Sequence, residues 1–188
     1  MEPATLKLYV FGSCESDQYY HPRQDNESKR PICLSDIESF KPETDEEEEG
    51  QSDRPAIPNP LRNAGILKIA CGALHTVVAT VEGKVFTFGC NDEGALGRDG
   101  PEKVPTEVKL DFAIDLISAG DNHSIFASSG AGKVYFTGNY KYMRGEKMVE
   151  PIKVPELFDI DAISNRGNAE SKLTKVVSGS NHSAILLA

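Results

Sequence analysis

Short apolar segments alternate with polar turns along much of this chain. Two groups of segments share one layout. Each has three runs rich in β-branched and aromatic residues, with a Gly-containing turn between the second run and the third. No segment shows an apolar stripe at helical spacing. The pattern predicts an all-β fold with strands at residues 66–70, 76–80, 84–88, 115–118, 124–127 and 133–136.

Two sequence elements recur along the chain. The first is an aromatic-rich strand that ends in Gly, at residues 8–12, 85–89 and 134–138. In the second, a Gly is followed after two residues by His and then Ser or Thr. Its histidines are His75, His123 and His182, at intervals of 48 and 59 residues. The underlying unit is roughly 50 residues long, which is typical of propellers and similar arrays.

One segment makes the repeat more specific. Residues 85–99 read Val-Phe-Thr-Phe-Gly-Cys-Asn-Asp-Glu-Gly-Ala-Leu-Gly-Arg-Asp and resemble a repeat of the regulator of chromosome condensation family. Residues 118–123 and 155–158 add to the resemblance, which covers roughly residues 5–12 and 65–188. It implies a seven-bladed β-propeller of about twice this length. We therefore expect an all-β, partial β-propeller of about three blades, open rather than closed.

The expected open end has several explanations that the sequence leaves open. The chain is a fragment, a truncated relative, or a half that is completed by self-association or by a second propeller half. An open propeller leaves strand edges unpaired, and unpaired edges favour pairing with another chain.

The chain divides into three parts in this interpretation. Residues 1–12 provide the first propeller strand, and residues 61–188 provide the propeller repeats. The repeat units lie at about 65–115, about 116–172 and 173–188, the last being the start of a further unit. Residues 13–60 are polar and lack strand or helix periodicity, so we expect a disordered, acidic insertion there.

Acidic residues are concentrated in that insertion. Residues 43–53 hold seven acidic residues and no basic one, and without them the formal net charge of −9 becomes −2. The loop is either an interaction or phosphorylation site or a solvated insertion of no further function. The acidic balance argues against a general nucleic-acid binder, which requires a basic surface.

Other classes of chemistry and location are also disfavoured. No apolar run approaches the ~20 residues needed to span a bilayer. The first residues do not read as a secretory signal, so we expect a nuclear or cytoplasmic protein without membrane contact. The four cysteines form no Cys-x-x-Cys pair. Walker-type, nucleophile-elbow and zinc-protease motifs are missing as well, so we expect no metal, no cofactor and no bond-making catalyst.

The resemblance implies a function. The founding member of the family is the guanine-nucleotide exchange factor for the small GTPase Ran, which acts in nucleocytoplasmic transport and mitosis. The resemblance therefore implies a Ran-type GTPase as partner. The founding member also has a basic tail that binds nucleosomal DNA. Residues 1–5 carry no such basic charge, so direct DNA binding is not expected. The alternative function is a non-catalytic repeat scaffold that mediates protein–protein interaction.

The resemblance also implies which residues take part. Acidic residues just before the repeat His accompany exchange activity in the family. Asp121 matches one such position, whereas the second holds Asn181. A β-hairpin wedge of the family matches residues 139–146, although a repeat that has drifted explains this loop equally well. The candidate GTPase-interface residues are Asp121, Asn181, Tyr140, Lys141, Tyr142 and Arg144.

Recurrence of a residue in every unit favours a structural role, because one active site cannot use every blade equally. The residues for which we expect this role are Gly72, His75, Gly120, His123, Gly179 and His182. Arg98 and Asp99 close the most typical loop, and they contact a partner or pair with each other.

Overall fold

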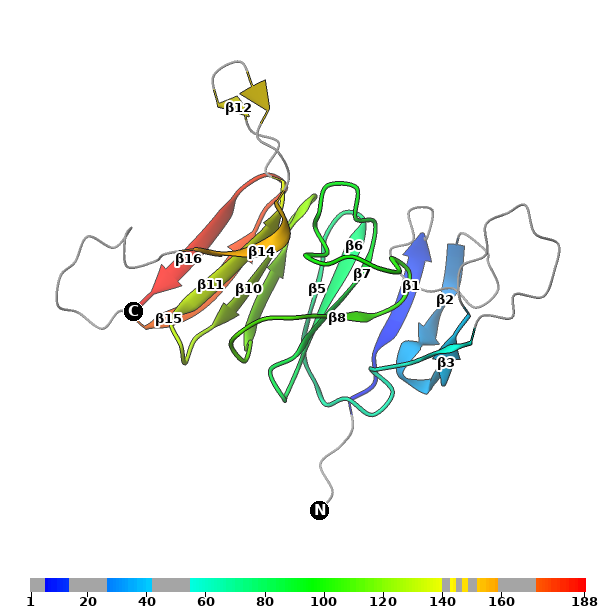
Figure 1. The fold of residues 1–188 in the computed structure, drawn as a ribbon. Coiled ribbons are helices and arrows are strands. Elements are labelled where there is room, and N and C mark those ends of the chain that lie inside the picture. The colour runs from blue at the N-terminus through cyan, green and yellow to red at the C-terminus, as the bar shows by residue number, and fades with distance from the viewer. Residues whose placement is uncertain are drawn as a thin grey trace.

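The computed structural model describes residues 6–13, 27–41, 55–139, 143–144, 147–148, 152–158 and 172–188. Within these ranges the chain is built of β-strands and one short 3-10 helix. Two sheets have four antiparallel strands each, and we call them blade I and blade II (Figure 1). Blade I has the order β5(Ile66–Cys71), β6(His75–Thr80), β7(Val85–Gly89), β8(Thr106–Val108). Blade II has the order β9(Leu116–Ala119), β10(His123–Ser128), β11(Lys133–Gly138), β14(Ile152–Phe158).

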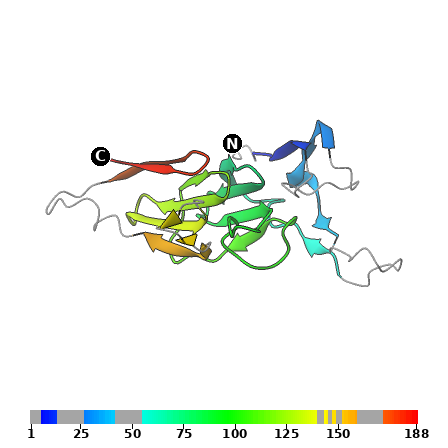
Figure 2. The same ribbon diagram turned by 90° about the horizontal axis from the view of Figure 1, so that it is seen from above.

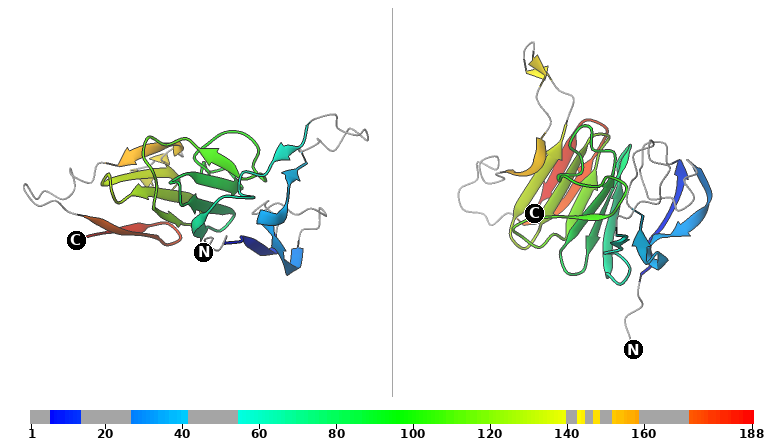
Figure 3. Two further views of the ribbon diagram at one scale, coloured as in Figure 1. Left: turned by 90° about the horizontal axis from the view of Figure 1, so that it is seen from below. Right: turned by 45° about the vertical axis from the view of Figure 1, so that its right-hand side comes forward.

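A two-stranded sheet flanks this pair of blades on either side. The pair β1(Tyr9–Ser13) and β2(Glu27–Cys33) lies beside blade I, and the pair β15(Leu173–Ser178) and β16(Ser183–Leu187) lies beside blade II. The sheets follow one another in a row that does not close on itself, as Figures 2 and 3 show from further directions. The prediction of an all-β, open, partial propeller is therefore confirmed.

Smaller elements fill the remaining described segments. They are η1(Leu34–Asp36), β3(Ser39–Phe40), β4(Ile57–Pro58), β12(Met143–Arg144) and β13(Lys147–Met148). The β3–β4 and β12–β13 pairs are antiparallel, and β12–β13 projects away from the ends of the blade strands (Figure 1).

The strands within a blade are joined by tight turns. Between β6 and β7 the Gly83 N–H donates to the Thr80 carbonyl at 2.9 Å. Gly83 has a φ of 79°, a backbone conformation that residues other than glycine rarely adopt. The same register follows in both blades, with His75 opposite Gly89 and His123 opposite Gly138. The repeated sequence thus produces a repeated strand pairing.

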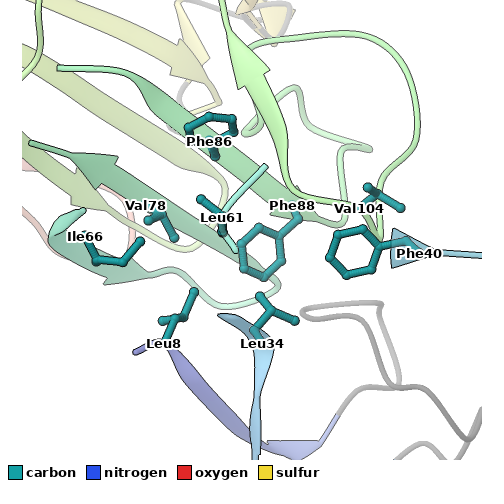
Figure 4. Close-up of a cluster of buried hydrophobic side chains, with 9 residues drawn as sticks. All are labelled: Leu8, Leu34, Phe40, Leu61, Ile66, Val78, Phe86, Phe88 and Val104. Atoms are coloured by element: carbon teal, nitrogen blue, oxygen red, sulfur yellow. The ribbon is translucent and has the colours of Figure 1, made fainter. Parts of the chain in front are cut away.

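The apolar side chains of the strands pack between successive sheets rather than in one central core. Leu8, Leu34 and Phe40 meet Val78 and Phe88 of blade I in the first cluster, which Figure 4 shows. A second cluster joins blade I to blade II, and a third joins blade II to the β15–β16 pair. Since each sheet has one face toward each neighbour, the two middle strands of blades I and II are buried on both faces.

The expectation of disorder over residues 13–60 is wrong for a large part of that range. Residues 27–41 form β2, η1 and β3, and both Leu34 and Phe40 are fully buried against blade I. The apolar residues of this segment are sparse and irregularly spaced, so the sequence shows no strand periodicity there. The acidic run at residues 43–53 lies outside the described residues.

Candidate functional site

The Gly-x-x-His elements form the tight turns β5–β6 of blade I, β9–β10 of blade II and β15–β16. The backbone N–H of Gly72 donates to the His75 carbonyl at 2.8 Å, and Gly120 and His123 repeat this bond at 2.9 Å. A Cβ atom on Gly120 would lie 2.1 Å from His123 Cε1 and 2.5 Å from the Gly179 carbonyl oxygen. Only glycine therefore leaves room for the His123 ring beneath the turn and for the close approach of the next sheet.

The histidine rings connect neighbouring sheets. His75 Nε2 lies 2.9 Å from the Ser124 hydroxyl of blade II, and that hydroxyl donates to the Ala95 carbonyl at 2.8 Å. The hydroxyl proton is used on Ala95, so His75 Nε2 carries a hydrogen and donates it to Ser124. His123 Nε2 repeats the contact with Ser183 Oγ at 2.9 Å. Each bond joins one unit to the following one.

Burial sets the protonation of the two inner histidines. Burial, together with a smaller effect of the nearby His123, lowers the pKa of His75 to about 4. Burial also lowers the pKa of His123, against an opposing effect of the Asp121 carboxylate. Both rings are neutral near pH 7. His182 occupies the same repeat position but is exposed.

Arg98 is buried and its contacts are internal. Its Nη2 donates to the Thr87 carbonyl at 2.7 Å, and its Nε donates to Thr87 Oγ1 at 3.1 Å. Burial lowers the pKa of Arg98 to about 10. It reaches Asp99 only through that residue's backbone carbonyl, at 3.3 Å. Pairing with the Asp99 carboxylate, one of the two expectations, is therefore not what the structure shows.

Two of the predicted interface residues lie together on one loop surface. The Asp121 N–H donates to the Ser180 carbonyl at 3.1 Å, and the Ser180 hydroxyl donates to the Asp121 carboxylate. The Asn181 side-chain amide donates to the same Ser180 hydroxyl at 3.1 Å. Ser180 thus holds Asp121 and Asn181 close together. Sequence reasoning missed Ser180, although it stands at the repeat position of Asp121.

The same surface continues to the base of the projecting hairpin. The Asn139 N–H, directly after β11, donates to the Asn122 carbonyl at 2.8 Å. The Asn139 side chain donates to the Glu93 carboxylate at 2.7 Å. The chain then leads to the β12–β13 hairpin, where Arg144 is opposite Lys147. Asn139 is the first residue of the predicted wedge at 139–146, and Glu93 lies in the repeat segment 85–99, but neither was named as a candidate interface residue.

The other predicted wedge residues are only partly described. Tyr140, Lys141 and Tyr142 lie outside the described residues, and for Arg144 only the backbone position in β12 is described. Within the described ranges no cluster of three or more His, Cys, Asp or Glu side chains is placed to hold a metal ion. In that same part of the chain, no helix has the length and apolarity to cross a membrane.

Comparison with known proteins identifies the repeat. Two models of the regulator of chromosome condensation (RCC1) repeat match residues 82–127 and 66–95. The chain carries RCC1 repeats. It is 36% identical over 131 residues to the human "Regulator of chromosome condensation", an alignment that covers 65% of this chain and 29% of the human protein.

The chain is also similar to proteins with other names. The chain is 34% identical over 119 residues to the human "Probable E3 ubiquitin-protein ligase HERC6", an alignment that covers 60% of this chain and 11% of that protein. The crystal structure of Prp20p from Saccharomyces cerevisiae, described with its binding to Gsp1p and histones, superimposes with a TM-score of 0.66 at 21% identity. That match covers 97% of this chain and 39% of Prp20p. The chain therefore spans well under half of the relatives it matches.

Proposed function

We propose that this chain is a guanine-nucleotide exchange factor, or part of one, for a small GTPase of the Ran type. It acts as a regulator rather than a chemical catalyst, in the nucleus or the cytoplasm, in nucleocytoplasmic transport and mitosis. The similarity to human regulator of chromosome condensation and the fold shared with Prp20p support the proposal. No DNA or membrane contact forms part of it.

The observation that carries the proposal is the joining of a carboxylate and a projecting hairpin on one surface. Asp121 is held by Ser180, and Asn122 beside it accepts the hydrogen bond from Asn139 that anchors the base of β12–β13. An exchange factor works by binding the nucleotide-free GTPase more tightly than the loaded form. A fixed negative charge and a protruding segment can meet that requirement, because they stabilise an opened nucleotide site.

Asn181 sets the expected strength of the activity. Its amide bonds to Ser180 beside Asp121, so a carboxylate at this position would place a second negative charge on the same surface. A hydrogen bond to a charged group contributes about 1.5–3 kcal/mol of stabilisation. Applied to the state that releases nucleotide, this corresponds to roughly a ten- to a hundredfold change in rate. The natural chain is therefore expected to be a weak exchange factor.

The test is release of a fluorescent guanine nucleotide from Ran with catalytic amounts of the chain. Asp121→Asn is expected to slow release by about ten- to a hundredfold, and Asn181→Asp is expected to accelerate it by a similar factor. Glu82→Gln is the matched control. It removes an exposed acidic side chain from the β6–β7 turn, at the opposite end of the strand from His75.

Two negative results together would reject the proposal that the chain is an exchange factor. If a folded sample accelerates release no more than buffer does, and Asn181→Asp changes nothing, the chain is not an exchange factor for Ran. The same loop surface would then serve a non-catalytic scaffold for protein–protein interaction. A cooperative unfolding transition establishes that the sample is folded.

A further inference from the structure

The β12–β13 hairpin belongs to blade II, but blade I supports both of its attachments. The hairpin lies in the connection between β11, which ends at Gly138, and β14, which begins at Ile152 (Figure 1). The supporting part of blade I is residues 91–98, which follow β7 and which we call the blade I loop. This loop makes one contact at each end of the connection.

The blade I loop is fixed by its own hydrogen bonds. Asn91 Nδ2 donates to the Arg98 carbonyl at 3.0 Å, and Asn91 Oδ1 accepts the Leu96 N–H at 3.0 Å. The Gly94 N–H donates to the Asn91 carbonyl at 2.8 Å, and residues 94–98 are buried. A loop that is closed and buried in this way is a rigid support for the segments that pack on it.

The first contact lies at the β14 end of the connection. The Thr137 hydroxyl is 2.8 Å from the Gly94 carbonyl oxygen and 2.7 Å from the Ile152 carbonyl oxygen. A Cβ on Gly94 would lie 3.0 Å from the Ile152 carbonyl oxygen and 3.1 Å from Lys153 Cα. The blade I loop therefore packs directly against the start of β14.

The second contact lies at the β11 end and is made by Asn139. This residue is buried, and its side-chain amide donates to the Glu93 carboxylate at 2.7 Å. Its backbone N–H donates to the Asn122 carbonyl at 2.8 Å, in the turn that carries Asp121. Asn139 therefore joins the blade I loop to the Asp121 turn. Because the chain leaves β11 at Asn139, the orientation of this residue sets the direction in which the hairpin starts.

We propose that Glu93 is a positioning residue of the exchange site. It acts through Asn139, whose side chain it holds, and so keeps the β12–β13 hairpin in place beside Asp121. This role rests on the proposed function, because it assigns Glu93 a part in nucleotide exchange. A displaced hairpin lowers the rate even where no contact with the GTPase is removed. The role requires a hydrogen-bond acceptor that reaches Asn139, and it does not require a negative charge.

Two conservative substitutions separate positioning from direct contact with the GTPase. Glu93→Gln keeps the length of the side chain and an acceptor oxygen but removes the charge. Glu93→Asp keeps the charge but is shorter by one methylene group, so the carboxylate no longer reaches Asn139. Positioning requires that Glu93→Gln is active and that Glu93→Asp is impaired. The reverse result would mean that the charge contacts the GTPase directly, and it would overturn the inference.

Release of a fluorescent guanine nucleotide, measured over a range of Ran concentrations, gives kcat and KM separately. Glu93→Asp is expected to lower kcat at least about fivefold and to change KM less than about twofold, because the hairpin acts on the opened nucleotide site rather than on the first encounter. Glu93→Gln is expected to keep kcat within about twofold of the parent chain. Asp92→Asn is the matched control, since it removes an exposed acidic side chain from the same loop.

Exchange of donor and acceptor tests the pair itself. Asn139→Asp alone places two carboxylates together and is expected to lower kcat at least about tenfold. Combined with Glu93→Gln, it restores one donor and one acceptor in the reverse order, and kcat is expected to return to within about threefold of the parent chain. If the combined chain is no more active than Asn139→Asp alone, the two side chains do not act as a pair and the inference is overturned.

Amide hydrogen exchange of the Asn139 N–H, followed by NMR, tests the anchor without Ran. This N–H is bonded to the Asn122 carbonyl. Glu93→Asp is expected to speed its exchange at least about fivefold, whereas Glu93→Gln and Asp92→Asn leave it close to the parent rate. An unchanged rate in Glu93→Asp overturns the anchor whether or not the chain acts on Ran. A parent chain that releases no nucleotide but shows this difference rejects the proposed function, and with it the role of Glu93 in exchange, while the anchor itself stands.

Discussion

Acidification should destabilise this fold chiefly through His75. The side chain is buried, and its pKa falls from an ordinary value of 6.5 to about 4 in the folded chain. Between these values the unfolded chain binds a proton that the folded chain does not bind. The free energy of unfolding therefore falls as the pH falls through this window, and the contribution is fully present above pH 6.5.

The size of the effect follows from the two pKa values. Between about pH 7.5 and about pH 4.5, His75 alone should remove about 2.5 kcal/mol from the free energy of unfolding. A small domain has only about 5–15 kcal/mol in total. His123 acts in the same direction, because burial lowers its pKa as well.

Urea unfolding followed by circular dichroism, repeated across this pH range, measures the effect. His75→Gln keeps a donor for Ser124 but cannot titrate, so its loss of stability over the window should be smaller by about 2.5 kcal/mol. His182→Gln is the matched control, since it removes an exposed histidine from the same repeat position. If His75→Gln loses as much stability as the parent, the burial argument is refuted.

Two further substitutions test the packing between units. Gly120→Ala would place a Cβ against His123 Cε1 and should destabilise the chain by about 1–3 kcal/mol, whereas Gly130→Ala, with nothing within 4 Å, should change stability by less than about 0.5 kcal/mol in the same urea titration. Arg98→Met should lower stability by about 1–3 kcal/mol, because the Thr87 carbonyl loses a buried charged donor; an unchanged urea midpoint would contradict this role.

Sequence patterns predicted the inner strands well and the outer ones poorly. The expected strands at residues 76–80, 84–88 and 124–127 coincide closely with β6, β7 and β10, which are buried and therefore rich in apolar residues. The outer strands β8 and β14 were not predicted. They contain Glu, Lys and Pro and are held by pairing with β7 and β11 rather than by their own composition.

The interface residues show the same limit. The family resemblance pointed to Asp121 and Asn181, which the structure brings together, but not to Ser180, through which they are joined. Glu93 and Asn139 are 46 positions apart in the chain and meet only because blades I and II pack side by side. A contact of this kind depends on tertiary structure, and no local pattern encodes it. The wedge residues at 139–146 remain a prediction.

The three repeat histidines show why an identical motif need not have identical chemistry. His75 and His123 are buried because the following unit supplies a serine and a sheet that cover them. His182 is exposed because no following unit stands beside it in the described chain. In a stacked array each unit obtains half of its environment from its neighbour. The motif therefore makes burial of the histidine possible. Whether the histidine is buried as a neutral hydrogen-bond donor depends on the neighbouring unit.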